Sequence, residues 1–159
     1  MTERTFITEY VTTIDQPIEM VWAIVGAFSG IKCWMPGIDS CEVFPNEKGE
    51  INGIGATRRV RNTTENMFVK ETLEILDNKN HYISYRLHDD GHGFPFKGCR
   101  GNNKLTAKGE NCTEFKWWTD ADEISPEGVE FAAPKLAPFF KQGVGELRKI
   151  VTRPQVNYL

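Results

Sequence analysis

The first part of the chain alternates in part between apolar and polar positions and then changes to a helical period. Residues 4–15 are rich in threonine, isoleucine, valine and aromatic side chains, which predicts a β-strand. The next residues are typical of a helix start: Asp15 is an acidic cap, Pro17 an early proline and Glu19 a glutamate near the first turn. Apolar residues follow at helical spacing, at Ile18, Val21, Trp22 and Val25. A second, short helix is predicted over residues 30–34.

Between residues 39 and 124 the pattern changes to short strands separated by turn residues. Six strands are predicted, over residues 39–45, 54–62, 66–77, 80–89, 97–108 and 112–123. The breaks between them are rich in asparagine, aspartate and glycine, which are typical of hairpin turns. We therefore expect neighbouring strands to run antiparallel.

The last part of the chain is predicted to be a long amphipathic helix. Residues 134–151 carry apolar side chains three, four and seven positions apart, which gives a helix of about 27 Å. Residues 125–127 are expected to open a separate helical turn, and Pro138 predicts either a kink or a later helix start. A straight helix on a twisted antiparallel sheet leaves a gap that side chains do not fill, so an α+β fold with an internal cavity is expected.

Length and composition narrow the classes of protein. A length of 159 residues predicts one domain, over residues 1–159. The shares of 40% hydrophobic and 26% charged residues are those of an ordinary globular domain. A net charge of −3 argues against broad nucleic-acid binding. The chain has no apolar run of 18 residues and no signal-peptide pattern at its start, so neither a membrane span nor secretion is expected. The four cysteines form no Cys-x-x-Cys pair, which favours free thiols in a reducing cytoplasm.

Five segments, in order along the chain, resemble motifs of a known family. They are IDQPIEMVW at residues 14–22, WMPGIDSCE at 34–42, GATR at 55–58, KETLEILD at 70–77 and SYR at 84–86. The chain resembles the polyketide cyclase/dehydrase and lipid-transport family of the SRPBCC (START-like, helix-grip) superfamily. The resemblance covers about residues 8–152. It implies a seven-stranded antiparallel sheet wrapped around a long C-terminal helix, with two short helices after the first strand. The superfamily holds carriers, hormone receptors, cyclases and condensing enzymes, so the fold alone does not give the function.

Glu71 is the leading candidate for chemistry. It shares one face of its strand with Val69, Leu73 and Ile75, so a single carboxylate interrupts an apolar face. A buried carboxylate must be paired, hydrogen-bonded or protonated. The resemblance to plant hormone receptors lends Glu71 a ligand contact through water. Two interpretations stay open: Glu71 binds a ligand or transfers protons, or it forms a structural ion pair with an inward-facing Arg58. Arg58 is itself a candidate ligand-binding residue, because its guanidinium group could bind a ligand carboxylate through two hydrogen bonds.

Other candidates follow from the same alternation. Tyr85 could offer its hydroxyl to a ligand, and Asn103 is a polar residue beside the small Gly101. Trp117 is predicted to form an apolar wall, whereas Trp118 faces the other way as a candidate association surface, consistent with a homodimer. From the helix, Phe140 and Val144 are the expected ligand contacts, although most of this stripe is expected to be core.

The loop over residues 88–96 combines histidines, aspartates, glycines and phenylalanines. The resemblance places such a loop over the cavity mouth, where Phe94 and the glycines suit a mobile lid. His92 is a candidate base at this mouth. The spacing of the loop's histidines and aspartates matches no known metal motif, so no metal is expected, and no motif for a cofactor occurs either.

Two functions remain. The first is a non-enzymatic protein that binds an apolar or aromatic small molecule, such as a polyketide-like, lipid or hormone-like ligand. The second is a polyketide cyclase/dehydrase-type enzyme in which Glu71 with Tyr85 or His92 transfers protons. A single buried carboxylate would favour binding, whereas a carboxylate that faces a second titratable group would favour catalysis.

Overall fold

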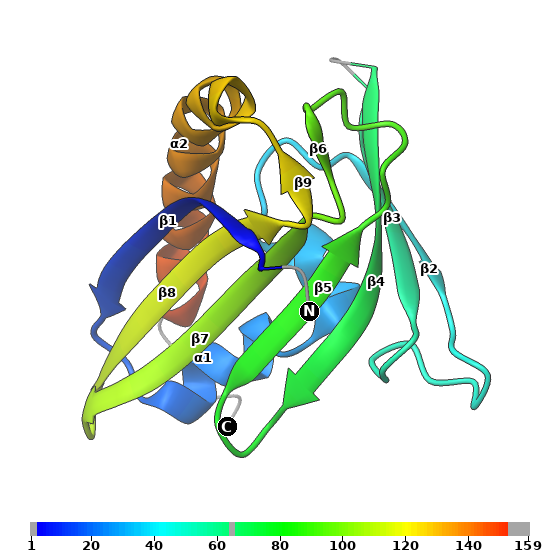
Figure 1. Cartoon of the computed structure of the whole chain (residues 1–159). Helices are drawn as coiled ribbons and strands as arrows, with labels where there is room; N and C mark the ends of the chain where they lie inside the picture. The colour runs from blue at the N-terminus through cyan, green and yellow to red at the C-terminus, as the bar shows by residue number, and fades with distance from the viewer. Residues whose placement is uncertain (1–2, 64–65, 153–159) are drawn as a thin grey trace.

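The computed structural model describes residues 3–63 and 66–152, which form a large sheet, a small two-stranded sheet, one long helix and two short ones (Figure 1). The order of elements is β1 (Thr5–Ile14), α1 (Ile18–Val25), the 3-10 helix η1 (Phe28–Cys33), β2 (Ser40–Phe44), β3 (Thr57–Asn62), β4 (Met67–Asp77), β5 (Tyr82–Leu87), β6 (Phe96–Lys97), β7 (Arg100–Gly109), β8 (Cys112–Ala121), β9 (Glu123–Ile124) and α2 (Pro126–Val151).

Seven strands form a single sheet in the order β1-β8-β7-β5-β4-β3-β2, and β6 pairs with β9 in a separate two-stranded sheet. Every pair of neighbours is antiparallel. Most neighbouring strands also follow each other in the chain, as in hairpins. An exception is β1, whose partner β8 lies near the end of the chain. The predicted helix-grip fold, with its α+β class and seven-stranded antiparallel sheet, is confirmed.

The two short helices lie close to where the sequence predicts them. Val21, Trp22 and Val25 form the buried face of α1, as their helical spacing requires. The predicted cap is wrong, because the residue before the helix is Pro17 and no side chain caps its amides. Asp15 lies two residues farther upstream. Proline is suited to this place because its fixed φ leads into a helix.

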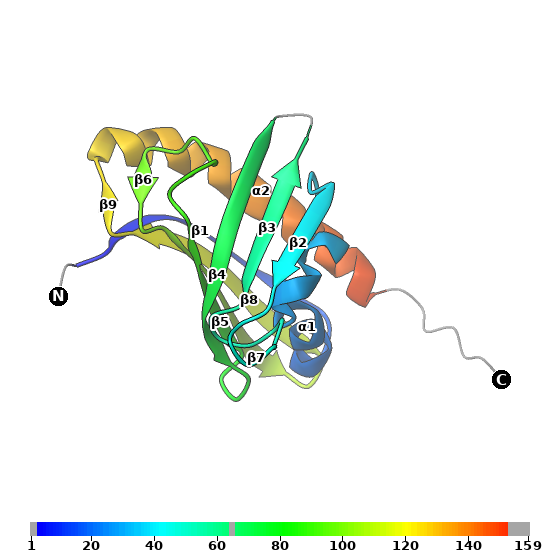
Figure 2. The ribbon, with the colours of Figure 1, turned by 90° about the vertical axis from the view of Figure 1, so that its right-hand side faces the viewer.

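Helix α2 is one element of 26 residues, and it begins at Pro126 rather than at Pro134. The Ser125 hydroxyl oxygen accepts a hydrogen bond from the Gly128 amide at 3.0 Å and so caps the first turn. The separate turn that the sequence predicted at 125–127 is therefore the beginning of the long helix. Pro134 and Pro138 both lie inside it, and the helix changes direction along its length (Figure 2).

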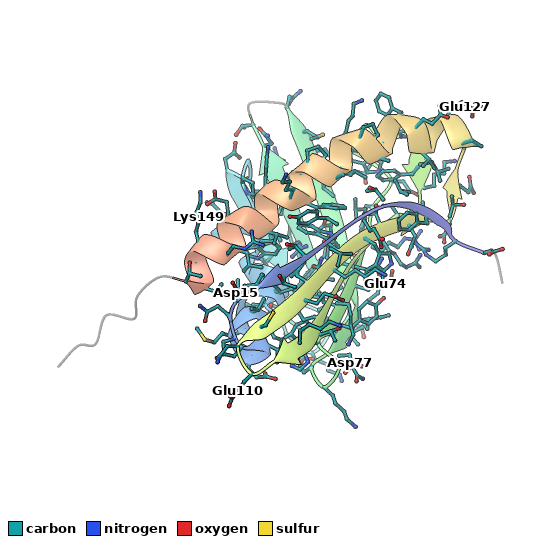
Figure 3. The ribbon with its side chains drawn as sticks, turned by 90° about the vertical axis from the view of Figure 1, so that its left-hand side faces the viewer. Asp15, Glu74, Asp77, Glu110, Glu127 and Lys149 are labelled. Atoms are coloured by element: carbon teal, nitrogen blue, oxygen red, sulfur yellow. The ribbon has the colours of Figure 1, made fainter. Side chains whose placement is uncertain are left out.

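The main core lies between α2, the short helices and the concave face of the sheet. In Figure 3, α2 crosses over this face between Glu127 at one end and Lys149 near the other, with side chains filling the space below. The C-terminal half of α2 packs through Phe140, Val144 and Leu147, which are buried. Arg148 donates hydrogen bonds to Thr12 Oγ1 and Thr13 O, at 3.2 and 3.0 Å, and so ties the helix to β1.

Trp118 lies on the opposite, convex face of the sheet and is half-buried. Its ring stacks on Tyr82 with centroids 5.8 Å apart and planes 2° from parallel, and Lys116 lies over the indole. The contacts described for Trp118 are therefore within the chain, and the homodimer remains a prediction.

Composition predicted free thiols and no membrane-spanning segment. Cys33, Cys41, Cys99 and Cys112 are all free, as predicted. Within the described residues, no helix is long and apolar enough to cross a bilayer.

Candidate functional site

A cavity of about 650 Å³ lies between α2 and the concave face of the sheet. This volume is in the range of small-molecule sites. Its wall is built from the segment that follows η1, from β3, β4, β5, β7 and β8, from the loop before β6 and from α2. Most lining residues are aliphatic or aromatic, and they include Ile31, Met35, Ile38, Val60, Val69, Leu87, Phe94, Phe96, Phe131, Leu136, Phe139, Phe140 and Trp117.

Arg58 and Glu71 form a buried ion pair in this wall. They lie opposite each other in the register of β3 and β4, and Arg58 Nε is 2.5 Å from Glu71 Oε2. Arg58 Nη1 also donates a hydrogen bond of 2.6 Å to the carbonyl oxygen of Phe28. Of the two interpretations of Glu71, the ion pair with Arg58 is the one that is present in the structure. Since the two charges cancel, this part of the wall is close to neutral.

Tyr85 lies against the same arginine. The Arg58 guanidinium carbon is 4.2 Å from the centre of the Phe28 ring and 4.7 Å from that of Tyr85, so the cation is held between two aromatic rings. Burial, reinforced by the Glu71 charge, raises the pKa of Tyr85 far above its usual value. The phenol is therefore neutral at physiological pH and can donate its proton only in a hydrogen bond.

Gly101 makes room for the Tyr85 ring, not for Asn103. The two residues are register partners on β5 and β7, and a Cβ at position 101 would lie 2.3 Å from Tyr85 Cε2. Asn103 is buried, and its side-chain amide donates to the Asn102 carbonyl at 3.2 Å. The structure places Asn103 outside the cavity lining. Gly101 was expected to leave open space beside Asn103, but the Tyr85 ring of the neighbouring strand occupies that space.

His92 lies in the cavity wall and is only 3% exposed. Its Nδ1 accepts a hydrogen bond of 2.9 Å from the Phe94 amide, and its ring packs on Phe96 with centroids 4.7 Å apart. Burial lowers the pKa of His92, although Asp89 and Asp90 oppose this shift. The neutral ring with an accepting Nδ1 carries its proton on Nε2, which has no hydrogen-bond partner among the described residues.

Two other polar residues of this loop make hydrogen bonds outside the cavity wall. His88 Nε2 is 2.8 Å from the Thr72 hydroxyl, and Asp89 accepts a hydrogen bond from the Gly98 amide at 2.9 Å. In the part of the chain that the structure describes, no three histidine, cysteine, aspartate or glutamate side chains are grouped as metal ligands. The predicted lid residue Phe94 lines the cavity and stacks on Phe96, with centroids 5.3 Å apart.

Strand β8 contributes Trp117 and Thr119 to the wall. Trp117 stacks on Phe140 of α2, with centroids 4.4 Å apart and planes 14° from parallel, so both predicted aromatic contacts meet in the lining. Thr119 was not a candidate, although it shares the inward face of Trp117 by period-two alternation. Val144, one helical turn beyond Phe140, is fully buried in the core and does not line the cavity.

The sequence analysis also missed the contribution of the first turns of α2. Phe131 and Lys135 line the cavity, and the Lys135 ammonium lies 3.8 Å from the centre of the Phe131 ring. Phe131 is 48% exposed, so it belongs to the rim rather than to the interior. It was missed because the helix was predicted to begin after it.

Comparisons with solved structures show the same fold in proteins of low sequence identity. A solution structure from Thermobifida fusca superposes with a TM-score of 0.79 at 21% identity, over 96% of this chain and 97% of the other. Norcoclaurine synthase from Thalictrum flavum, solved with dopamine and hydroxybenzaldehyde, gives a TM-score of 0.76 at 14% identity, over 97% and 91% of the two chains. A putative uncharacterized protein from Bacillus thuringiensis gives 0.71 at 19% identity, over 92% and 98%.

Comparison with curated proteins finds no significant sequence match. The comparison with family models does find one, which is described as polyketide cyclase/dehydrase and lipid transport and covers residues 5–152. That range contains every strand of the sheet, the three helices and all the residues that line the cavity. The chain belongs to the polyketide cyclase/dehydrase and lipid transport family.

Proposed function

We propose that this protein binds an apolar or aromatic small molecule in the cavity between α2 and the sheet. The observation that carries the proposal is a cavity of about 650 Å³ lined mainly by aliphatic and aromatic side chains, in which the buried charges of Arg58 and Glu71 cancel. Burial of apolar ligand surface against such a wall supplies the main driving force for binding. The aromatic side chains in the lining, among them Phe94, Trp117 and Phe140, suit an aromatic ligand.

The comparisons support this class of ligand. The family description includes lipid transport and polyketide chemistry, and both concern largely apolar molecules. Norcoclaurine synthase, which shares the fold, was solved with dopamine and hydroxybenzaldehyde, two small aromatic molecules. We transfer only the class, a small aromatic or apolar molecule, to this chain.

The alternative is a cyclase/dehydrase-type enzyme in which Glu71 with Tyr85 or His92 transfers protons. In its favour, all three side chains line one cavity. Binding has the stronger support, because none of the three offers a free base. Glu71 is paired with Arg58, Tyr85 has a raised pKa, and the unpartnered nitrogen of His92 already carries a proton.

Binding is tested with N-phenyl-1-naphthylamine, a neutral aromatic dye that fluoresces in apolar surroundings. We expect one dye per chain and a dissociation constant raised about tenfold or more by Val69→Phe, which fills the cavity. Val11→Phe is the matched control, because it makes the same change on an exposed position of β1. The proposal is wrong if the dye does not bind, or if both variants bind it as the original protein does.

The enzymatic alternative has a separate test. Exchange of the methyl protons of 2-acetylnaphthalene for deuterium reports general acid–base chemistry at a ketone and is followed by NMR. Exchange that depends on the protein and is lost in Tyr85→Phe would favour the enzyme. Binding of the dye without such exchange favours a carrier or sensor.

We also propose that the protein works in the reducing cytoplasm, which its four free thiols support. Association into a homodimer stays a prediction, and sedimentation velocity at several concentrations tests it.

A further inference from the structure

Few buried polar atoms lack a partner in the described part of the chain, and they are concentrated at the cavity. Five side-chain nitrogen or oxygen atoms are buried without a hydrogen bond. Two are the Nε atoms of Arg59 and Arg61, whose guanidinium groups lie over the Phe68 ring, and Arg61 also lines the cavity. The other three are His92 Nε2, Trp117 Nε1 and Thr119 Oγ1, and all three residues line the cavity.

Buried polar atoms without a hydrogen-bond partner destabilise the folded state, and native proteins contain few of them. His92 and Thr119 are 3% and 5% exposed, so bulk water does not compensate them. The Trp117 indole lies near enough to Tyr85 to oppose the rise in the pKa of that phenol, but it lacks the geometry of a hydrogen bond. A concentration of such atoms in one cavity wall indicates that their partner is a bound molecule.

The three groups follow one side of the cavity. Trp117 and Thr119 are two positions apart on β8 and therefore point to the same face. Ala121, the next residue on that face, packs in one cluster with Phe96. The His92 ring lies against Phe96, so the series continues from the strand into the loop before β6. We call His92, Trp117 and Thr119 the donor wall.

The chemistry of the donor wall is that of hydrogen-bond donors without charge. An indole nitrogen can only donate, and His92 presents Nε2–H because its Nδ1 accepts from the Phe94 amide. The Thr119 hydroxyl can donate as well. The buried cation of the lining, Arg58, is already neutralised by Glu71. The remaining lining cations, Arg61 and Lys135, lie over the rings of Phe68 and Phe131.

We propose that the donor wall binds the carbonyl-type oxygen of an uncharged aromatic ligand. This inference rests on the proposed function, which it makes narrower: the ligand has an apolar body and at least one neutral oxygen acceptor. A carboxylate is disfavoured at the donor wall itself, because its charge would be buried beside uncharged donors there. The lining cations Arg61 and Lys135 are the groups that would attract a carboxylate, and the 2-naphthoate probe below tests for this.

Three probes of the same shape test the inference on the unaltered protein. They are 2-acetylnaphthalene, which carries a ketone, 2-isopropenylnaphthalene, which has a methylene group in place of the oxygen, and 2-naphthoate. Their dissociation constants are measured by displacement of N-phenyl-1-naphthylamine. We expect the ketone to bind about tenfold more tightly than the alkene and more tightly than the carboxylate. The infrared carbonyl stretch of the bound ketone should fall below its value in hexane.

Two variants assign the preference to the donor wall. Thr119→Val removes the hydroxyl at constant shape, and His92→Asn removes Nε2 while an amide oxygen can still accept from the Phe94 amide. Each should lower the preference for the ketone several-fold, and Thr119→Val should leave the melting temperature equal or higher, because an unpartnered polar group is removed. Thr106→Val, on the outward-facing side of β7, is the control and should change neither.

The outcomes separate the inference from the proposed function. Equal binding of ketone and alkene overturns the donor wall but leaves cavity binding intact. If 2-naphthoate binds most tightly of the three probes, the proposal that the ligand is uncharged is wrong. A ketone preference that persists in both variants shows that other groups recognise the oxygen. If neither the dye nor any of the probes binds, the proposed function fails and the inference fails with it.

Discussion

At the scale of single residues, Arg58 holds the cavity wall together through three kinds of contact. Its guanidinium group pairs with Glu71, donates to the Phe28 carbonyl and lies between the Phe28 and Tyr85 rings. These contacts join β3, β4, β5 and η1 around one cation. Because the Arg58 cation is buried, the stability of the folded protein depends strongly on the one carboxylate, that of Glu71, which neutralises it.

Glu71→Gln should therefore destabilise the protein by about 3 kcal/mol, because it leaves Arg58 as a buried charge without a counter-ion. Urea denaturation at pH 7 measures this change. The matched control is Glu74→Gln on the outer face of the same strand, where Glu74 pairs with Arg100 at 2.7 Å and both side chains are partly exposed. That variant should lose less than about 1 kcal/mol. Equal losses in the two variants would mean that burial does not make the Arg58 pair special.

Strand alternation predicted the inward face of the wall, except beyond Leu73, where a register shift in the β4–β5 pairing leaves Ile75 40% exposed instead of inward-facing. Arg58, Glu71, Tyr85 and Trp117 all line the cavity, because a sheet with one buried face leaves no other register. Alternation could not tell which inward side chains line a cavity and which fill the core. Asn103 illustrates this limit, since its burial was foreseeable but its hydrogen bond to the next residue's carbonyl was not.

At the scale of elements, α2 determines the extent of the cavity. Its first turns carry Phe131 and Lys135 to the rim, whereas its C-terminal half fills the core. The helix was predicted eight residues too short because Pro134 was taken as its beginning. A proline inside a helix costs one backbone hydrogen bond, and tertiary packing outweighs that local cost here. Only the contacts of the rest of the fold could reveal this.

The first turn of α2 depends on its cap. Ser125→Ala removes the oxygen that accepts from the Gly128 amide, and it should lower the free energy of unfolding by about 1 kcal/mol. Ser125→Asp keeps an acceptor at the same place and adds a favourable charge at the helix N-terminus, so it should retain the stability. Thermal denaturation of the two variants measures the difference. A loss in Ser125→Asp as large as that in Ser125→Ala would rule out capping as the cause.

At the scale of the whole molecule, stability should depend on pH through His92. Burial lowers its pKa in the folded protein, whereas the unfolded chain takes up a proton near the ordinary value of about 6.5. The stabilisation is thus fully present above pH 6.5 and is lost as the pH falls toward the folded pKa. Asp89 and Asp90 reduce the effect without reversing its direction.

We expect the free energy of unfolding to fall more between pH 7.5 and pH 5 in the original protein than in His92→Asn. Urea denaturation of both proteins at the two pH values measures the difference, and the variant cancels the contributions of the other titrating groups. Parallel decreases in the two proteins would contradict the assignment to His92.

The pairing of β1 with β8 affects how the molecule is made. Thr5 lies opposite Ala121, and Ile14 lies opposite Thr113, so the first strand of the chain has its partner near the end. During synthesis, the hairpins from β2 to β7 can form as they emerge from the ribosome, because their strands are close in sequence. The N-terminal strand must wait until β8 has been translated, and the closure of so long a loop is slow. Until then β1 lacks the strand with which it pairs, so its inward side chains Ile7 and Ile14 are covered only once β8 is complete.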